Sequence, residues 1–255
     1  MIAVIVPIYN TEKYLRETID SVICQTLSFA EHIRLILLDD ASTDGSFAIC
    51  EQYQKQYPKQ ILVKHYDTNQ GVSALRNEGV RIAGEMGDEL ITFLDSDDKL
   101  ADDAMEKAVQ YFDAHEDVFV AAIGIRYFDA YEGEQRLNWR FEKTDVVDIK
   151  KDYTYPHYYV GGVFLRHAVL DELHFDESLS FWEDALAVNQ VIVSQGKYGL
   201  IAGTHYYYRK MNLLLSIRHG IKKSVIQRCY RLVMDSYLPT QGKSTIVLFL
   251  MCSTW

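Results

Sequence analysis

Residues 91–98 read Ile-Thr-Phe-Leu-Asp-Ser-Asp-Asp, an apolar run that ends abruptly in acidic side chains. The run lacks the alternation of a half-exposed strand, so it predicts a buried parallel strand. Open α/β sheets bind ligands at the carboxyl ends of such strands. Crowded aspartates repel one another unless a cation lies between them, and carboxylate oxygens suit Mg²⁺ or Mn²⁺, which commonly also bind substrate phosphates. The stretch therefore predicts a nucleotide-diphosphate site, and the alternative is a solvated acidic turn that caps the next helix.

The composition allows one large domain, or one domain with an appendage. The chain has 255 residues, 48% of them hydrophobic. Its formal charge of −10 argues against a nucleic acid as partner. From Tyr206 onward there are eight cations and one acid, so this end carries +7 and the rest of the chain carries −17. A basic end on an acidic body predicts contact with phosphates or with a lipid surface.

The four cysteines are widely spaced, which indicates neither a zinc site nor a disulfide framework. Reduced thiols in a cytoplasmic protein are the simplest interpretation. The chain begins directly in a strand-like run, without the pattern of a signal peptide, and no apolar stretch is long enough to span a bilayer. It ends inside the apolar stretch 245–255, as we expect of a protein cut before its natural end.

Strand and helix patterns alternate through the first hundred residues, which predicts a parallel sheet covered by helices. The expected strands are residues 2–8, 33–38, 61–66 and 89–94, and the expected helices are residues 12–26, 46–57 and 72–83. Asn10 or Thr11 is expected to cap the first helix. Polar residues follow each strand and are expected to converge on one edge of the sheet: Tyr9 and Asn10, Asp39 and Asp40, Asn69, Asp95 and Asp97. This convergence favours a functional site over solvated turns.

The second half of the chain is less regular. We expect a helix at 101–115, strands at 118–123, 158–165 and 197–208, an insertion or short hairpin within 127–155, and a basic amphipathic helix at 217–238. That last helix either lies on a membrane surface or packs on the core with a solvated basic face. The pair Gly161-Gly162 either lets a ligand or backbone approach closely or forms a simple bulge.

Asp184 stands at the end of the aromatic stretch 179–184, just before an apolar helix expected at 185–194. It is either a general base that faces an acceptor pocket or an ordinary N-cap. His205 lies near the end of the strand expected at 197–208. A lone histidine is more often structural than a ligand.

Five motifs, taken in order, resemble those of family 2 glycosyltransferases of the GT-A fold. They are Val-Ile-Val-Pro-Ile-Tyr-Asn at 4–10, Asp-Asp-Ala-Ser-Thr-Asp-Gly at 39–45, Asn-Gln-Gly-Val-Ser-Ala-Leu-Arg-Asn at 69–77, Asp-Ser-Asp-Asp at 95–98 and Trp-Glu-Asp at 182–184. The resemblance implies an α/β, Rossmann-like, mostly parallel central sheet flanked by helices. It implies a catalytic domain at 1–208 and a basic helical C-terminal segment at 209–255.

The resemblance also implies a role for each matching residue. The residues expected to bind the nucleotide-sugar are Pro7, Tyr9, Asp39, Asp40, Asn69, Arg76, Asp95 and Ser96. The other expected roles are metal ligands Asp97 and His205, a diphosphate contact from Arg209, an acceptor pocket with Trp182 and Glu183, and Asp184 as catalytic base. Residues 209–212, Arg-Lys-Met-Asn, depart from the sequence that is usual at this place in the family.

The implied activity is inverting transfer of a sugar from a UDP-sugar to a hydroxyl of a glycan or lipid-linked acceptor, with Mn²⁺ or Mg²⁺ as cofactor. By family analogy, the product is a cell-surface or teichoic-type polysaccharide. We expect a cytoplasmic protein whose basic C-terminal segment contacts the inner face of the membrane, with homo-oligomerisation left open. The alternative is a non-catalytic UDP-sugar-binding or scaffold subunit. No glycine-rich loop follows the first strand, which disfavours a nucleotidyltransferase or a dinucleotide-dependent dehydrogenase.

Overall fold

Strand β1 (Ile2–Ile8) is fully buried and has a parallel neighbour on each side. These neighbours are β2 (Ile33–Asp39) and β4 (Leu90–Phe93), and β3 (Ile61–His65) extends the parallel sheet beyond β2. Pro7 is tolerated in this central strand because the ladder between β1 and β4 already ends at Ile5. The apolar run that begins at Ile91 is therefore buried and parallel to β1, as its pattern predicts.

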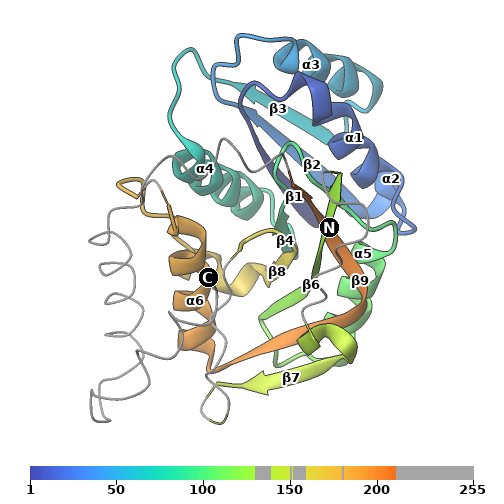
Figure 1. Cartoon of the computed structure of the whole chain (residues 1–255), viewed down its shortest axis with the longest axis vertical. Helices are drawn as coiled ribbons and strands as arrows, with labels where there is room; N and C mark the ends of the chain where they lie inside the picture. Colours follow the sequence, from blue (N-terminus) through green and yellow to red (C-terminus); the bar gives the residue numbers. More distant parts are fainter. Residues whose placement is uncertain (130–138, 150, 152–158, 180, 211–255) are drawn as a thin grey trace. The chain divides into compact units, whose positions relative to one another are not determined.

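The computed structural model describes residues 1–129, 139–149, 151, 159–179 and 181–210, all within one compact unit (Figure 1). The basic helix expected at 217–238 lies outside the described residues, as does most of the segment expected at 209–255. The membrane contact assigned to that segment stays a prediction. Among the described residues, no helix is both long enough and apolar enough to cross a membrane.

The second half of the sheet is mixed. Strand β8 (Val163–Arg166) lies antiparallel between β4 and β6 (Val120–Asp129), and β9 (Lys197–Lys210) runs parallel to β6. Two short strands, β5 (Lys99–Leu100) and β7 (Asp145–Asp148), pair antiparallel with β9. In the described residues the sheet order is β3-β2-β1-β4-β8-β6-β9-β5, with β7 also on β9. The expected α/β class with a mostly parallel sheet is confirmed.

Helices cover both faces of the sheet (Figure 1). One core contains Val4 and Val6 together with apolar side chains of four helices: α1 (Glu12–Ile23), α2 (Phe29–His32), α3 (Ser46–Gln56) and α5 (Ala104–Ala114). The other core contains Ala3 and Ile5 together with apolar side chains of α4 (Val72–Glu85), η2 (His167–Glu172) and α6 (Glu183–Gln195). Successive β1 side chains thus fill opposite cores, because side chains alternate along a strand. A second short helix, η1 (Trp139–Glu142), packs on β6 and β9.

The remaining differences from the expected elements lie mostly in the second half. Strand β8 begins five residues later than expected, β6 continues six residues beyond Ile123, and β9 continues through Arg209 and Lys210. The region 127–155 contains η1 and β7 rather than a hairpin of its own in the described residues, and β7 pairs with the distant β9.

Candidate active site

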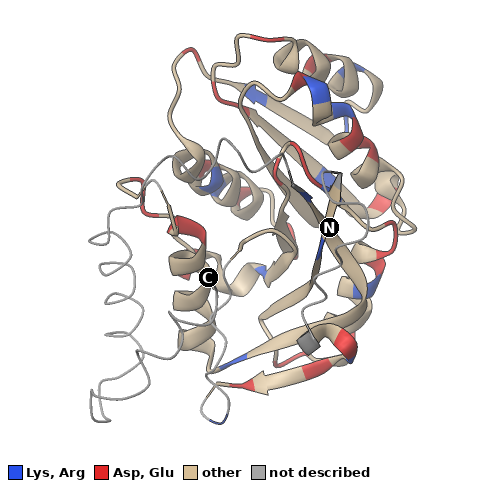
Figure 2. Cartoon of the chain, in the orientation of Figure 1, with Lys and Arg blue, Asp and Glu red and all other residues tan. Residues whose placement is uncertain are grey.

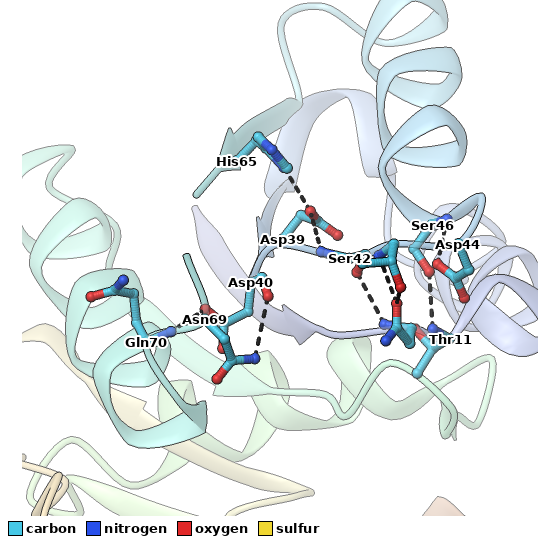
Figure 3. Close-up of polar contacts among 11 residues, drawn as sticks. Thr11, Asp39, Asp40, Ser42, Asp44, Ser46, His65, Asn69 and Gln70 are labelled. Carbon is cyan, nitrogen blue, oxygen red and sulfur yellow. Dashed lines mark hydrogen bonds and ion pairs between the residues drawn. The ribbon is translucent and has the colours of Figure 1, made fainter. Parts of the chain in front are cut away.

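The loops that follow β1, β2 and β3 meet in what we call the loop cluster, residues 9–12, 39–46 and 65–71. Asp40 is its centre: its carboxylate accepts backbone N–H groups of Gln70 at 2.6 Å and Gly71 at 2.9 Å (Figure 3). The Asn69 amide donates to the Asp40 carbonyl at 3.3 Å. Gly71 has φ of +89°, a conformation that favours glycine. Asp40 therefore fixes the entry to α4, and Asn69 lies beside it as expected.

The loops after β1 and β2 are joined by several hydrogen bonds. Asn10 N–H donates to Ser42 Oγ at 3.0 Å, and its side-chain oxygen accepts Thr43 N–H at 2.8 Å. Glu12 N–H, at the start of α1, donates to the Asp44 carboxylate at 3.1 Å. Thr11, one of the two expected candidates, occupies the N-cap position, but its side chain makes no capping hydrogen bond. The side chain that accepts the Glu12 N–H is instead Asp44, from the loop after β2.

Asp39 and Tyr9 lie at different depths in the loop cluster. The Asp39 carboxylate is fully buried and pairs with His65 Nδ1 at 2.7 Å (Figure 3), and its Oδ1 has no hydrogen-bond partner within the described residues. Tyr9 is 51% exposed at the end of β1, whereas Pro7 is buried within that strand. Of these side chains, the Tyr9 ring is therefore the one available to a ligand.

The acidic loop, residues 95–98, follows β4. Asp98 is buried: its Oδ1 accepts the Arg209 N–H at 2.6 Å and its Oδ2 accepts the Tyr206 hydroxyl at 2.7 Å. Burial, with the neighbouring charge of Asp95, raises the pKa of Asp98 to about 8. The loop does not cap the next helix, since α5 begins at Ala104 with Asp103 at its N-cap. The alternative of a simple capping turn is therefore excluded.

Asp97 is half-buried in the middle of this loop. Burial, and then the charge of Asp95, raise the pKa of the Asp97 carboxyl. Within the described residues, no side chain of another residue donates a hydrogen bond to it. Ser96 beside it is buried, and its carbonyl accepts the Thr18 hydroxyl at 2.9 Å. The Ser96 backbone thus anchors the loop to α1, and the nearby Arg209 charge only partly opposes the rise in the Asp97 pKa.

Arg76 joins the acidic loop to the start of α6. Its guanidinium donates to Asp95 Oδ1 at 3.1 Å and to Glu183 Oε1 at 3.0 Å, and it lies over the Phe175 ring at 5.6 Å. The residue is only 4% exposed. The resemblance implies that Arg76 binds the nucleotide-sugar, but two of its donor nitrogens are already bound to carboxylates. Its structural effect is to hold two parts of the site together.

Asp184 lies in the first turn of α6, next to Glu183. The start of this helix is coloured red, for acidic residues, in Figure 2. Its carboxylate accepts the N–H groups of Ala185 at 2.7 Å and Val160 at 3.4 Å. Burial raises the pKa of Asp184 to about 6, the Arg76 charge opposes this rise, and the Glu183 charge adds to it. The N-cap position belongs to Trp182, so the interpretation of Asp184 as an ordinary N-cap is excluded. A carboxylate with such a pKa can accept a proton near neutral pH.

Backbone strain is concentrated at these loops. Within the described residues, the non-glycine residues with positive φ are Asn10 at 52°, Ala41 at 60° and Trp182 at 69°. Left-handed backbone costs a non-glycine residue roughly 1–2 kcal/mol, and such strain clusters at functional sites. Trp182 is 37% exposed and its neighbour Phe181 49% exposed, so aromatic surface lies beside Asp184 as expected of an acceptor pocket.

His205 and Arg209 are not brought to the places expected for them. His205 and Tyr206 are adjacent on β9, so they point to opposite faces, and Tyr206 is the one that meets the acidic loop. Burial, and then the charges of Arg126 and Lys107, lower the pKa of His205, and the charge of Asp103 opposes this lowering. The structure therefore offers no support for His205 as a ligand shared with Asp97.

The Arg209 guanidinium is enclosed by protein groups. It lies 4.5 Å from the Tyr14 ring and 4.4 Å from the Phe128 ring, donates to the Asp97 carbonyl at 2.6 Å and pairs with Glu17. Its side chain is 5% exposed. The residue expected at a diphosphate is thus a support of the acidic loop.

A metal ion would find oxygen ligands at Asp95 and Asp97. Among the described residues there is no group of three or more His, Cys, Asp or Glu side chains arranged to hold an ion. One or two carboxylates are, however, the usual protein share of a Mg²⁺ site that substrate phosphates complete. The raised pKa of Asp97 fits such a role, because a cation would relieve the repulsion from Asp95.

Tyr206 is a site residue that the sequence did not indicate, and it packs against the glycine pair that the sequence did mark. A Cβ added to Gly161 would lie 2.7 Å from Cζ of the Tyr206 ring, so the glycine leaves the room that this ring occupies. The close approach expected at the glycine pair is therefore that of a side chain. The available signals were the glycine pair and the run of three tyrosines after His205, but neither indicates the other as its partner.

Comparison with known proteins agrees with this geometry. A model of the family described as glycosyl transferase family 2 matches residues 3–174. The minor teichoic acid biosynthesis protein GgaA of Bacillus subtilis is 40% identical over 246 residues, which cover 93% of this chain and 55% of GgaA. GgaB of the same organism is 38% identical over 211 residues, 81% of this chain and 23% of GgaB. The chain thus spans about half or less of these curated relatives.

Among solved structures, TarS 1–349 of S. aureus in complex with UDP-GlcNAc superposes with a TM-score of 0.79. The identity is 23%, and the match covers 95% of this chain and 68% of the TarS chain. GalNAc-T7 with UDP, GalNAc and Mn²⁺ matches with a TM-score of 0.62 at 15% identity, over 84% of this chain and 44% of that chain. At these identities the likeness establishes the fold, which is the GT-A glycosyltransferase fold.

Proposed function

The chain belongs to glycosyl transferase family 2, and we propose that it moves a sugar from a UDP-sugar donor to a hydroxyl group of a teichoic-type cell-wall polymer. The observation that carries this proposal is the Arg76 bridge, which joins Asp95 of the acidic loop to Glu183, next to Asp184. A donor-side acid and a candidate base are thereby held in one site. The relatives named for teichoic acid biosynthesis and the TarS complex with UDP-GlcNAc support the choice of acceptor and donor.

The donor is proposed to lie across the two groups of loops. The exposed Tyr9 ring offers a stacking surface for a uracil base. Asp95, whose side chain is 39% exposed, faces outward enough to meet a ribose or sugar hydroxyl. Asp95 and Asp97 are the residues that would hold Mn²⁺ or Mg²⁺. Such an ion supplies positive charge where negative charge develops on the UDP leaving group.

The acceptor hydroxyl must lose a proton as its oxygen attacks the anomeric carbon. We assign that proton to Asp184, because a half-buried carboxylate whose pKa is about 6 is charged at neutral pH and still basic enough to accept it. The exposed rings of Phe181 and Trp182 offer apolar surface for an acceptor sugar beside this base. Attack from the side opposite the leaving UDP inverts the anomeric configuration.

The test is UDP release from a panel of UDP-sugars, with Mn²⁺ and with a poly(ribitol phosphate) or poly(glycerol phosphate) acceptor present or absent. The expected result is acceptor-dependent UDP release from one or two donors and a new glycosidic bond on the polymer. Saturable UDP binding without turnover on any acceptor would instead favour a non-catalytic UDP-sugar-binding subunit. Absence of both binding and turnover would contradict both functions.

A further inference from the structure

Tyr206 meets the acidic loop twice through one hydroxyl group. The hydroxyl donates to Asp98 Oδ2 at 2.7 Å and accepts the Asp95 N–H at 3.1 Å. Tyr206 is 1% exposed, so water does not compete for either bond. The hydroxyl therefore bridges the first and the last residue of the turn that carries Asp97.

The surroundings of Tyr206 are shaped for its ring. An added Cβ on Gly161 would lie 2.7 Å from the ring's Cζ and 3.0 Å from its hydroxyl oxygen, and one on Gly162 would lie 3.0 Å from the Tyr206 Cβ. Real Cβ atoms essentially never come within 3.0 Å of a heavy atom, so a side chain at Gly161 would displace the ring. The glycine pair thus places the tyrosine hydroxyl under the loop.

This bridge distinguishes three aspartates that are alike in the sequence. Asp98 is held inward, because the Tyr206 hydroxyl and the Arg209 N–H occupy its two oxygens. Asp95 keeps a side chain that is 39% exposed, and Asp97 remains half-buried without a donor from another side chain in the described residues. The loop thereby leaves the carboxylates of Asp95 and Asp97 partly exposed and uses that of Asp98 as its anchor.

We propose that Tyr206 is a positioning residue that sets the geometry in which Asp95 and Asp97 receive the diphosphate and its cation. The inference rests on the proposed function, since it concerns the same donor site. Groups that hydrogen-bond to metal ligands and orient them contribute to the affinity of the site. Their loss typically costs 10–100-fold in metal affinity or activity. Tyr206 does not touch the donor in this scheme, and it acts through Asp95 and Asp98.

The test is Tyr206→Phe, which deletes the hydroxyl and keeps the ring that fills the space beside Gly161. We expect the Kd for UDP in Mn²⁺, measured by calorimetry, to rise about tenfold or more. The Kd for UDP with Mn²⁺ chelated should match that of the wild type, because the loop cluster is untouched. Tyr207→Phe is the matched control, since it deletes a hydroxyl from the next residue, which points to the opposite face of β9. This control should bind UDP as the wild type does under both conditions.

Gly161→Ala is the second variant, because it moves the ring without altering its chemistry. It should weaken Mn²⁺-dependent UDP binding in the same direction as Tyr206→Phe. A lower melting temperature in either variant, with unchanged Mn²⁺-dependent UDP affinity of the folded protein, would show a merely structural role and overturn the inference. If the wild type itself fails to bind UDP in Mn²⁺, the proposed function fails first, and that outcome is read directly from the wild-type titration.

Discussion

The loop cluster and the acidic loop use the same residue type in opposite ways. In the loop cluster, both oxygens of the Asp40 carboxylate are bound to backbone N–H groups, and Asp39 is paired with His65. Around the acidic loop and the start of α6, Arg76 pairs with Asp95 and Glu183, and the charge of Arg209 acts on Asp97. Five carboxyl groups gather there: Asp95, Asp97, Asp98, Glu183 and Asp184. In the first region the carboxylates are bound mostly by groups of the chain itself, whereas the second retains negative charge that a cation would compensate. The loop cluster is therefore a rigid support, and the chemistry is expected at the acidic loop and the start of α6.

The largest effect should come from Asp184→Asn, which keeps the shape of the side chain and removes its basicity. General base catalysis contributes about 10²- to 10⁴-fold, so we expect kcat to fall by that factor while the Kd for UDP stays nearly unchanged. The measurement is kcat by UDP release, paired with calorimetry. Asp171→Asn, on the exposed part of η2, is the control that should leave both values intact. Equal loss of UDP binding and transfer would mean that Asp184 is structural.

Asp97→Ala should have the next largest effect, and on binding rather than on the chemical step alone. Removing one of two outward carboxylates should weaken UDP binding in Mn²⁺ by about 10–100-fold, because that acid is expected to help hold the cation. UDP binding with Mn²⁺ chelated should change little. Calorimetric titrations with and without Mn²⁺ measure the difference. The same loss under both conditions would place the effect in the fold of the loop.

The pH dependence of kcat should reveal the charge balance around Asp184. Because burial raises its pKa to about 6, the carboxylate is mostly protonated at pH 5 and mostly charged at pH 7. A base must be charged to accept a proton, so kcat should rise about tenfold over that interval and then level off. A kcat that is flat between pH 5 and pH 7, with product release shown not to limit the rate, would argue against this residue as the base.

Arg76→Gln should shift the pH profile of kcat. Arg76 lowers the pKa of Asp184, so its removal should raise this pKa and move the midpoint of the kcat profile upward by about one unit or more. A variant that stays folded and keeps its midpoint near pH 6 would show that Arg76 does not act on the base. Thermal melting of the variant separates this effect from loss of the fold.

The smallest effect on transfer should come from the loop cluster. Asp40→Ala removes the acceptor for the N–H groups of Gln70 and Gly71, and we expect the free energy of unfolding to fall by about 2–3 kcal/mol. Transfer by the folded fraction should fall by less than tenfold. Urea denaturation measures the first quantity. Asp67→Ala, an exposed change in the same loop region, should leave stability within about 0.5 kcal/mol.

The parts of the structure that the sequence predicts are those fixed by local pattern. The strand that begins at Ile2 and the polar ends of the first four strands follow from apolar runs and from the rule that parallel strands share an edge. The orientation of β8 does not follow from pattern, since a fully buried strand is apolar throughout whether its neighbours run parallel or antiparallel. Strand β7 has polar ends and pairs with β9 across the chain, so no period marks it.

In the candidate site, too, the features set by local sequence could be predicted and those set by long-range contacts could not. Asp97 and Asp184 were predicted because acidic residues after a buried strand and before a helix are visible in the sequence. The partners that control them were not: Glu183 lies 107 residues from Arg76, and Tyr206 lies 108 residues from Asp98. A tyrosine or an arginine in a strand does not indicate which distant carboxylate it will meet. The acids could thus be named in advance, but their arrangement required the fold.

The central claim is that the acidic loop receives a uridine diphosphate together with a divalent cation. Calorimetric titration of the wild-type chain with UDP, once in Mn²⁺ and once with the metal chelated, tests it most directly. We predict saturable binding at one site in Mn²⁺ and binding at least tenfold weaker without it. Absence of binding in Mn²⁺, or equal affinity under the two conditions, would contradict the claim.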